Sequence, residues 1–132
     1  LNSTITTCTR DSSSGLLTIL ESISTLPAED PASTCAQIVC HPNGRFVYAS
    51  NRGHDSISCF RVLQNGTLEC IARKDTLGKT PSNFIISPDG EWLIVANQDS
   101  DNIVSFKVAD DGSLEEMGFE LQVASPVCLS AF

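Results

Sequence analysis

The chain has 132 residues, of which 41% are hydrophobic and 18% are charged, and its net charge is −8 at pH 7. This composition is typical of a globular domain and excludes a disordered segment. The acidic balance argues against nucleic acids and anionic membranes as partners, because both favour a basic protein surface. No apolar run approaches the roughly 18–20 residues that a membrane-spanning helix needs.

The first 25 residues predict two β-strands joined by a turn. The segment STITTCT (3–9) and the segment GLLTILESIST (15–25) are short and rich in β-branched residues, and a Ser/Gly turn separates them. An inner, apolar strand, CAQIVC (35–40), follows after a loop. No window of the chain has a convincing 3.6-residue apolar period, so we expect no helix.

The rest of the chain contains an internal repeat with a shift of 46 residues. Placing residues 41–69 on 87–115 without a gap gives ten identities in 29 positions. Each repeat has four strand-like segments between Gly, Pro, Asn and Asp turns. These are 35–40, 46–50, 56–62 and 67–75 in the first repeat, and 82–87, 92–96, 102–108 and 113–122 in the second. Four short antiparallel strands in about 45 residues predict an all-β fold of β-propeller blades.

This pattern divides the chain into about two and a half blades. Residues 1–34 are the end of one blade and a connecting loop, 35–80 and 81–125 are full blades, and 126–132 are the inner strand of a closing blade. Eleven strands are expected in total. Propellers close with 4–8 blades, so we expect the ring to be completed by remaining blades or by other copies of the chain. A closed single-chain sandwich is the alternative, but it does not explain the repeat.

The alternation of hairpins separates the loops onto two faces. The compact turns HPNG (41–44) and SPDG (87–90) lie on a face that we interpret as structural, and His41 with them. The opposite face carries the connections 52–55 and 98–101, together with the variable loops 27–34, 78–83 and 124–127. A ligand is expected at the mouth of the channel on this second face.

Arg52 and His54 are the candidate chemical residues of that face. Arginine offers a planar fork of donors that fits a carboxylate or a phosphate, so Arg52 predicts an anionic ligand. The alternative for Arg52 is a salt bridge to Asp55 or Asp101, two recurring residues that we expect to cap the turn. Histidine acts as an acid or base near neutral pH, but His54 is equally interpretable as an exposed loop residue.

The six cysteines, at positions 8, 35, 40, 59, 70 and 128, include no CxxC pair. The signal for a zinc site is therefore weak, and we expect neither a metal nor a cofactor. Most of these cysteines occupy apolar strand positions. Buried free thiols in a reducing compartment, the cytoplasm, are the resulting expectation.

The stretches HPNGRFVYASNRGHDSI, SPDGEWLIVANQDSDNI and GKTPSNF, with the closing SPVC, resemble the seven-bladed β-propeller lactonases. That family includes 6-phosphogluconolactonase and the 3-carboxy-cis,cis-muconate lactonizing enzymes. The resemblance covers the C-terminal part of such a ring. It implies hydrolysis of an anionic lactone or sugar-phosphate lactone, or an isomerase that makes or opens a lactone ring. The alternatives are a non-catalytic binding module and a self-assembling partial propeller.

The resemblance also implies roles for individual residues. Arg52 and His54 match the catalytic Asn-Arg-Gly-His segment of the family, where the arginine binds the anionic group or stabilises developing oxyanion charge. The remaining candidate substrate-binding residues are Asn51, Gln98, Ser82 and Asn83. Two departures from the family weigh against catalysis: Ser82 stands where the family usually has arginine, and the family's acidic residue falls just before Leu1.

Overall fold

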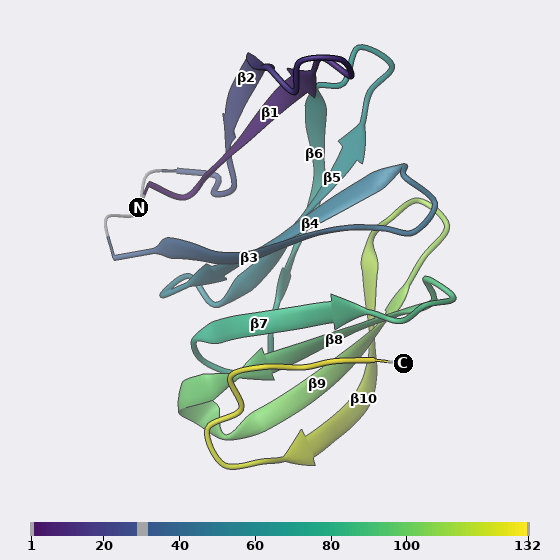
Figure 1. Cartoon of the computed structure of the whole chain (residues 1–132). Helices are drawn as coiled ribbons and strands as arrows, with labels where there is room; N and C mark the ends of the chain where they lie inside the picture. Colours follow the sequence, from purple (N-terminus) through teal and green to yellow (C-terminus); the bar gives the residue numbers. More distant parts are fainter. Residues whose placement is uncertain (1, 29–31, 132) are drawn as a thin grey trace.

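The computed structural model describes residues 2–28 and 32–131, which form ten β-strands in three antiparallel sheets (Figure 1). The first sheet is the hairpin β1-β2. The other two sheets have four strands each, β3-β4-β5-β6 and β7-β8-β9-β10, and in both the neighbouring strands follow one another in the sequence. The strands are β1 (Thr4–Arg10), β2 (Leu17–Ser24), β3 (Thr34–Cys40), β4 (Phe46–Arg52), β5 (Ser56–Val62), β6 (Leu68–Asp75), β7 (Pro81–Ile86), β8 (Trp92–Asn97), β9 (Asn102–Val108) and β10 (Leu114–Gln122).

The three sheets are stacked face to face as successive propeller blades (Figure 1). The strand β4 lies in the middle sheet, and every residue from Phe46 to Asn51 is buried. Alternate side chains of a strand point to opposite faces. Phe46 and Tyr48 therefore pack towards the β7–β10 sheet, whereas Val47 and Ala49 pack towards the hairpin. A strand covered on both faces reads as a continuous apolar run, which explains the sequence FVYAS.

Two apolar clusters hold the stack together. The larger lies between the two four-stranded sheets, and its buried members are Phe46, Tyr48, Ile57, Cys59, Phe84, Leu93, Val95, Val104, Phe106 and Leu114. The smaller lies between the hairpin and the middle sheet, and its buried members are Ile5, Val47, Ala49, Phe60 and Leu68. Burial of large apolar side chains between sheets is the main favourable contribution to such a fold.

The internal repeat of the sequence is also a repeat of backbone irregularities. The β3–β4 pairing shifts register between Cys35 and Ile38, and the β7–β8 pairing shifts between Pro81 and Asn83. The pairings β1–β2, β5–β6 and β9–β10 each contain a further shift. Bulges increase the local twist of a strand, so each sheet acquires its twist in a similar place.

The expectation of eleven strands was wrong by one, because residues 126–131 form no strand. This segment runs beside β7 and is held by side-chain hydrogen bonds (Figure 1). The Leu129 N–H donates to Asn83 Oδ1 over 2.9 Å, for example. A strand requires a ladder of backbone partners, and no backbone–backbone hydrogen bond joins residues 126–131 to β7 or to another described strand.

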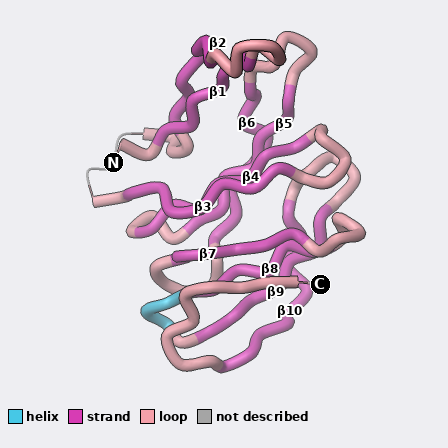
Figure 2. Tube along the Cα trace, in the orientation of Figure 1, coloured by secondary structure: helices cyan, strands magenta, loops and turns pink. Residues whose placement is uncertain are grey.

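The expectation of buried cysteines was correct only in part. All six thiols are free, but only Cys59 is buried, while Cys8, Cys40 and Cys128 are exposed. No helix among the described residues has the length and apolar character to cross a membrane. The one helical element in the described part of the chain is a 3₁₀ turn, η1 (Gln98–Ser100), which appears in cyan in Figure 2.

Candidate functional site

The connections expected to form the binding face lie on one side of the stack and are hydrogen-bonded to one another (Figure 2). The Thr80 N–H donates to the Asp55 carboxylate over 2.9 Å, and the Gln98 N–H donates to the Thr80 carbonyl over 3.0 Å. Further along, the Ser125 N–H donates to the Asp101 carboxylate over 2.7 Å. Hydrogen bonds from backbone N–H groups to Asp carboxylates and to a backbone carbonyl therefore link successive connections on this face.

Arg52 is the last residue of β4, where its backbone pairs with Thr34. It is half-buried, and its Nε atom is buried without a hydrogen-bond partner among the residues that the structure describes. The predicted salt bridge to Asp55 or Asp101 does not form, since the ion pairs among described side chains are Arg61–Glu69 and Lys74–Glu116. A buried guanidinium N–H without a partner is costly, so Arg52 has unused capacity to bind an anion.

His54 lies two residues further along the same loop and is exposed. Its Nδ1 atom is 2.8 Å from Ser56 Oγ, and Ser56 is the buried first residue of β5. This contact fixes one edge of the imidazole ring, while Nε2 makes no hydrogen bond with the described residues. The arrangement leaves Nε2 available to exchange a proton with solvent or with a ligand.

Asn51, predicted to bind substrate, is fully buried, and its amide is bonded to the interior of the blade. Its Nδ2 donates to Ser56 Oγ and Ser58 Oγ over 3.2 and 3.0 Å. Its Oδ1 accepts the Thr25 hydroxyl over 2.6 Å. In this arrangement Asn51 anchors the strand that carries Arg52 and the residue that contacts His54, and its direct contact with a ligand stays a prediction.

The remaining candidate binding residues differ in whether their side chains are already hydrogen-bonded. Gln98 begins η1, and its side-chain amide makes no hydrogen bond within the described part of the chain. Ser82 and Asn83, in contrast, face the C-terminal segment: Ser82 Oγ is 3.4 Å from the Pro126 carbonyl, and Asn83 Oδ1 accepts the Leu129 N–H. Of these three residues, Gln98 therefore keeps the most freedom to contact a ligand.

The recurring aspartates, Asp55 and Asp101, occupy the same left-handed backbone conformation, with φ of 55° and 56°. As expected, both carboxylates accept backbone N–H groups. Asp55 caps its own turn through the Gly53 N–H, and both aspartates also accept an N–H from the loop that enters the next blade. Ser3, with φ of 48°, is a third member of the set that the sequence did not indicate. The carbonyls of Ser3, Asp55 and Asp101 accept the N–H groups of Thr25, Thr76 and Val123 in turn.

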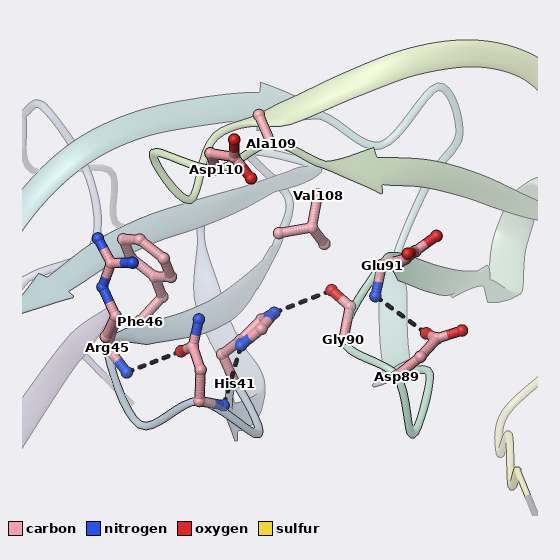
Figure 3. Close-up of a pocket in the computed structure, with 10 residues that line it drawn as sticks. His41, Arg45, Phe46, Asp89, Gly90, Glu91, Val108, Ala109 and Asp110 are labelled. Carbon is pink, nitrogen blue, oxygen red and sulfur yellow. Dashed lines mark hydrogen bonds between the residues drawn. The ribbon is translucent and has the colours of Figure 1, made fainter.

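The opposite face contains a pocket of about 460 Å³ between the turns of the two full blades (Figure 3). His41 Nε2 is 2.8 Å from the Gly90 carbonyl, and a β-carbon on Gly90 would lie 2.6 Å from the His41 ring. The imidazole therefore closes the junction between two turns, in agreement with the structural role expected for His41. No cluster of His, Cys, Asp and Glu suited to a metal ion occurs among the residues described.

Comparison with known proteins shows the family to which this architecture belongs. The family model of the lactonase with a seven-bladed β-propeller matches residues 1–131. A 6-phosphogluconolactonase of Bacillus subtilis (strain 168) is 50% identical over 44 residues, which are 33% of this chain and 13% of that protein.

Two solved structures are similar over nearly the whole chain. A protein of Lactobacillus plantarum has a TM-score of 0.92 and 30% identity, covering 96% of this chain and 38% of the other. The periplasmic gluconolactonase PpgL of Pseudomonas aeruginosa has a TM-score of 0.89 and 26% identity, covering 97% and 36%. The chain thus spans well under half the length of its relatives. It belongs to the seven-bladed β-propeller lactonase family.

Proposed function

We propose that the whole protein hydrolyses a sugar-phosphate lactone in the manner of a 6-phosphogluconolactonase. The observation that carries this proposal is the half-buried Arg52, whose buried Nε has no hydrogen-bond partner among the described residues. A guanidinium suits an oxyanion or phosphate better than any neutral ligand. In a protein of net charge −8, a cation with no ion-pair partner among the described residues favours an anionic ligand at this face.

The proposed reaction requires two groups that this loop supplies. Water attacks the lactone carbonyl and its proton passes to a base, which returns a proton to the ring oxygen as the ring C–O bond breaks. The products are a hydroxyl and a carboxylic acid, which loses its proton to solvent to become a carboxylate. His54 accepts the proton at Nε2 when its Nδ1–H is donated to Ser56 Oγ. Arg52 binds the substrate anion or stabilises the negative charge that develops on the carbonyl oxygen.

The test is a substitution of Arg52 in the whole protein, assayed with 6-phosphogluconolactone. Arg52→Ala should lower kcat/KM by about 100-fold or more, the effect of removing one oxyanion-stabilising donor. Arg52→Lys should restore only part of the activity, because a lysine lacks the planar fork. Arg61→Ala is the matched control, since Arg61 is an exposed cation paired with Glu69 on a strand of the same blade.

His54→Gln should remove the limb of the pH–rate profile that reports the base, while substrate affinity changes little. Unchanged kcat/KM in Arg52→Ala, or an unchanged pH profile in His54→Gln, would each refute the role proposed for that residue.

Ser82 favours a second candidate, a propeller that binds sugar phosphates without hydrolysing them. It stands where the family usually has arginine, and its hydroxyl faces the Pro126 carbonyl. Calorimetry separates the two candidates. If the whole protein binds 6-phosphogluconate through Arg52 but leaves the lactone intact, the binding module is correct and the hydrolase is not.

The blade organisation is also a proposal. We infer that residues 1–34 end one blade, 35–80 and 81–125 are full blades, and 126–132 begin another, with the ring completed by further blades or other copies. The uncovered apolar side chains of the outermost strands support this, among them Leu17 and Ile19 on β2 and Phe119 and Leu121 on β10. Light scattering on the whole protein distinguishes a monomeric ring from an assembly of copies. We keep the cytoplasm as the expected location, which fractionation would test.

A further inference from the structure

Asp55 occupies a central position on the candidate face although it is not itself a candidate for binding or catalysis. Its Oδ1 atom accepts two backbone N–H groups, that of Gly53 over 3.1 Å and that of Thr80 over 2.9 Å. The first lies inside the loop that carries Arg52 and His54, and the second lies in the loop entering the next blade. One carboxylate oxygen therefore joins the loop 52–55, which we call the reactive loop, to the loop 76–80.

The backbone of Asp55 reinforces this connection. Its carbonyl accepts both the N–H and the hydroxyl of Thr76, each over 3.0 Å. Thr80 continues the contact to the following blade, because its carbonyl accepts the Gln98 N–H over 3.0 Å. The Thr80 hydroxyl also donates to Asp99 Oδ2 over 2.5 Å. Through Thr80, the position of the reactive loop is thus coupled to that of η1.

The reactive loop has little else to hold it in place. Gly53 has φ of 90°, and its backbone passes so close to the preceding loop that a β-carbon would lie 2.6 Å from the Ala32 carbonyl oxygen. Among the described residues, Arg52 Nε has no hydrogen-bond partner, and the His54 side chain is hydrogen-bonded to Ser56 alone. A loop of this kind needs an internal cap to have one conformation, and carboxylate acceptors are the strongest caps available.

We propose that Asp55 is the positioning residue of the active site: it clamps the Arg52–His54 loop to the 76–80 loop, and thereby sets where Arg52 and His54 stand relative to the ligand. The inference rests on the proposed function for its effect on activity, but the clamp itself does not. A misplacement of about 1 Å in a catalytic group costs as much as 100-fold in rate, so loss of the clamp should be measurable without loss of the fold.

The experiment compares Asp55→Ala with Asp55→Asn in the whole protein. Asparagine keeps an oxygen acceptor and tolerates the left-handed conformation, so it should rescue most of what alanine loses. Hydrogen exchange monitored by mass spectrometry should be about tenfold faster or more in the peptides covering 53–55 and 76–80 of Asp55→Ala, and intermediate in Asp55→Asn. Asp101→Ala is the control for locality, because its carboxylate caps Ser125 and should affect only residues near 123–125.

The functional measurements are the Kd of 6-phosphogluconate and the kcat/KM for its lactone. Asp55→Ala should weaken binding and lower kcat/KM by about tenfold or more, whereas Asp55→Asn should recover most of both. The control here is Asp111→Ala, which removes a carboxylate that caps Ser113 N–H over 2.9 Å in the β9–β10 turn. This variant should leave binding and turnover unchanged.

The outcomes separate the clamp from the proposed function. Unchanged exchange in Asp55→Ala overturns the clamp. Faster exchange with unchanged binding and turnover overturns the positioning role. If the parent protein binds 6-phosphogluconate but does not hydrolyse the lactone, the proposed hydrolase fails while the effect of Asp55 on Kd still decides the positioning role. If the parent neither binds nor hydrolyses, both the proposed function and the positioning role fall.

Discussion

Gly112→Ala should destabilise the protein strongly although the residue is far from the candidate face. Gly112 has φ of 88°, a conformation that costs a residue with a β-carbon about 1–2 kcal/mol. The new β-carbon would also lie 2.4 Å from a ring carbon of Phe46, and overpacking of this kind costs about 1–3 kcal/mol. Together the two effects predict a loss of about 2–5 kcal/mol in the free energy of unfolding.

The control is Gly44→Ala, because Gly44 has φ of 71° but no atom within 4 Å of its β-carbon position. Urea unfolding of both variants isolates the steric part as the difference between their losses, provided the slope of the free energy with urea is unchanged. Adding Phe46→Leu should recover part of the loss in Gly112→Ala, since the two positions are in contact. Equal losses in Gly112→Ala and Gly44→Ala would refute the packing argument.

Three further predictions concern the interior and the turns. Tyr48→Phe removes a buried hydrogen bond of 3.0 Å to the Gly112 carbonyl and should lower the unfolding free energy by about 1–2 kcal/mol in urea; an unchanged midpoint would contradict this. Burial raises the pKa of Cys59 to about 12, so iodoacetamide at pH 8 should modify this thiol only after denaturation, and labelling in the native protein would count against its burial. The Ser113 hydroxyl, followed by its backbone N–H, lowers the pKa of Asp111. The ionised Asp111 carboxylate therefore stabilises the folded state fully above about pH 4, and this stabilisation is lost as the pH falls. Asp111→Asn should accordingly reduce the fall in the free energy of unfolding at acid pH. A curve that stays parallel to that of the parent would be evidence against it.

The fold could be predicted largely from the sequence because the chain contains two blades with the same structural requirements, so the same residue types recur in both. The shift of 46 residues preserves strand ends, turns and inward-facing side chains, and each of these is visible as a repeated residue type. Of the strand expected at 126–132, the described residues 126–131 form none, for a physical reason: the sequence shows an apolar segment, but only the surrounding structure shows whether its backbone has a ladder partner. The predicted burial of Cys8 and Cys40 was wrong for a similar reason, since the sequence pattern of a strand does not reveal which of its two faces another sheet covers.

The candidate site was predictable in its position but less so in its contacts. Loop alternation indicated the correct set of connections, and the repeated Asp55 and Asp101 indicated caps. Ser3 was missed because the shared property is a left-handed backbone conformation, which a serine does not signal. The salt bridge that was the alternative role for Arg52 does not form with Asp55 or Asp101. Both aspartates instead accept backbone N–H groups from neighbouring loops, a use that no pairing of charges along the sequence indicates.

The difference between Arg52-Gly53-His54 and Gln98-Asp99-Ser100 follows from how each loop is held. In the second loop the side chains themselves make the attachment: Asp99 accepts the Thr80 hydroxyl, and Ser100 Oγ accepts the Lys79 N–H over 2.8 Å. In the first loop Gly53 allows the bare backbone to pack against the preceding loop, and Asp55 supplies the cap from outside the triplet. Fixing the first loop through its backbone leaves Arg52 and the Nε2 edge of His54 uncommitted. The two repeats share a scaffold, and in the second loop the Gln98 amide is also without a hydrogen bond to the described residues. The candidate cation and the candidate base, Arg52 and His54, both lie in the first loop, which is why we expect the chemistry of this face at 52–54.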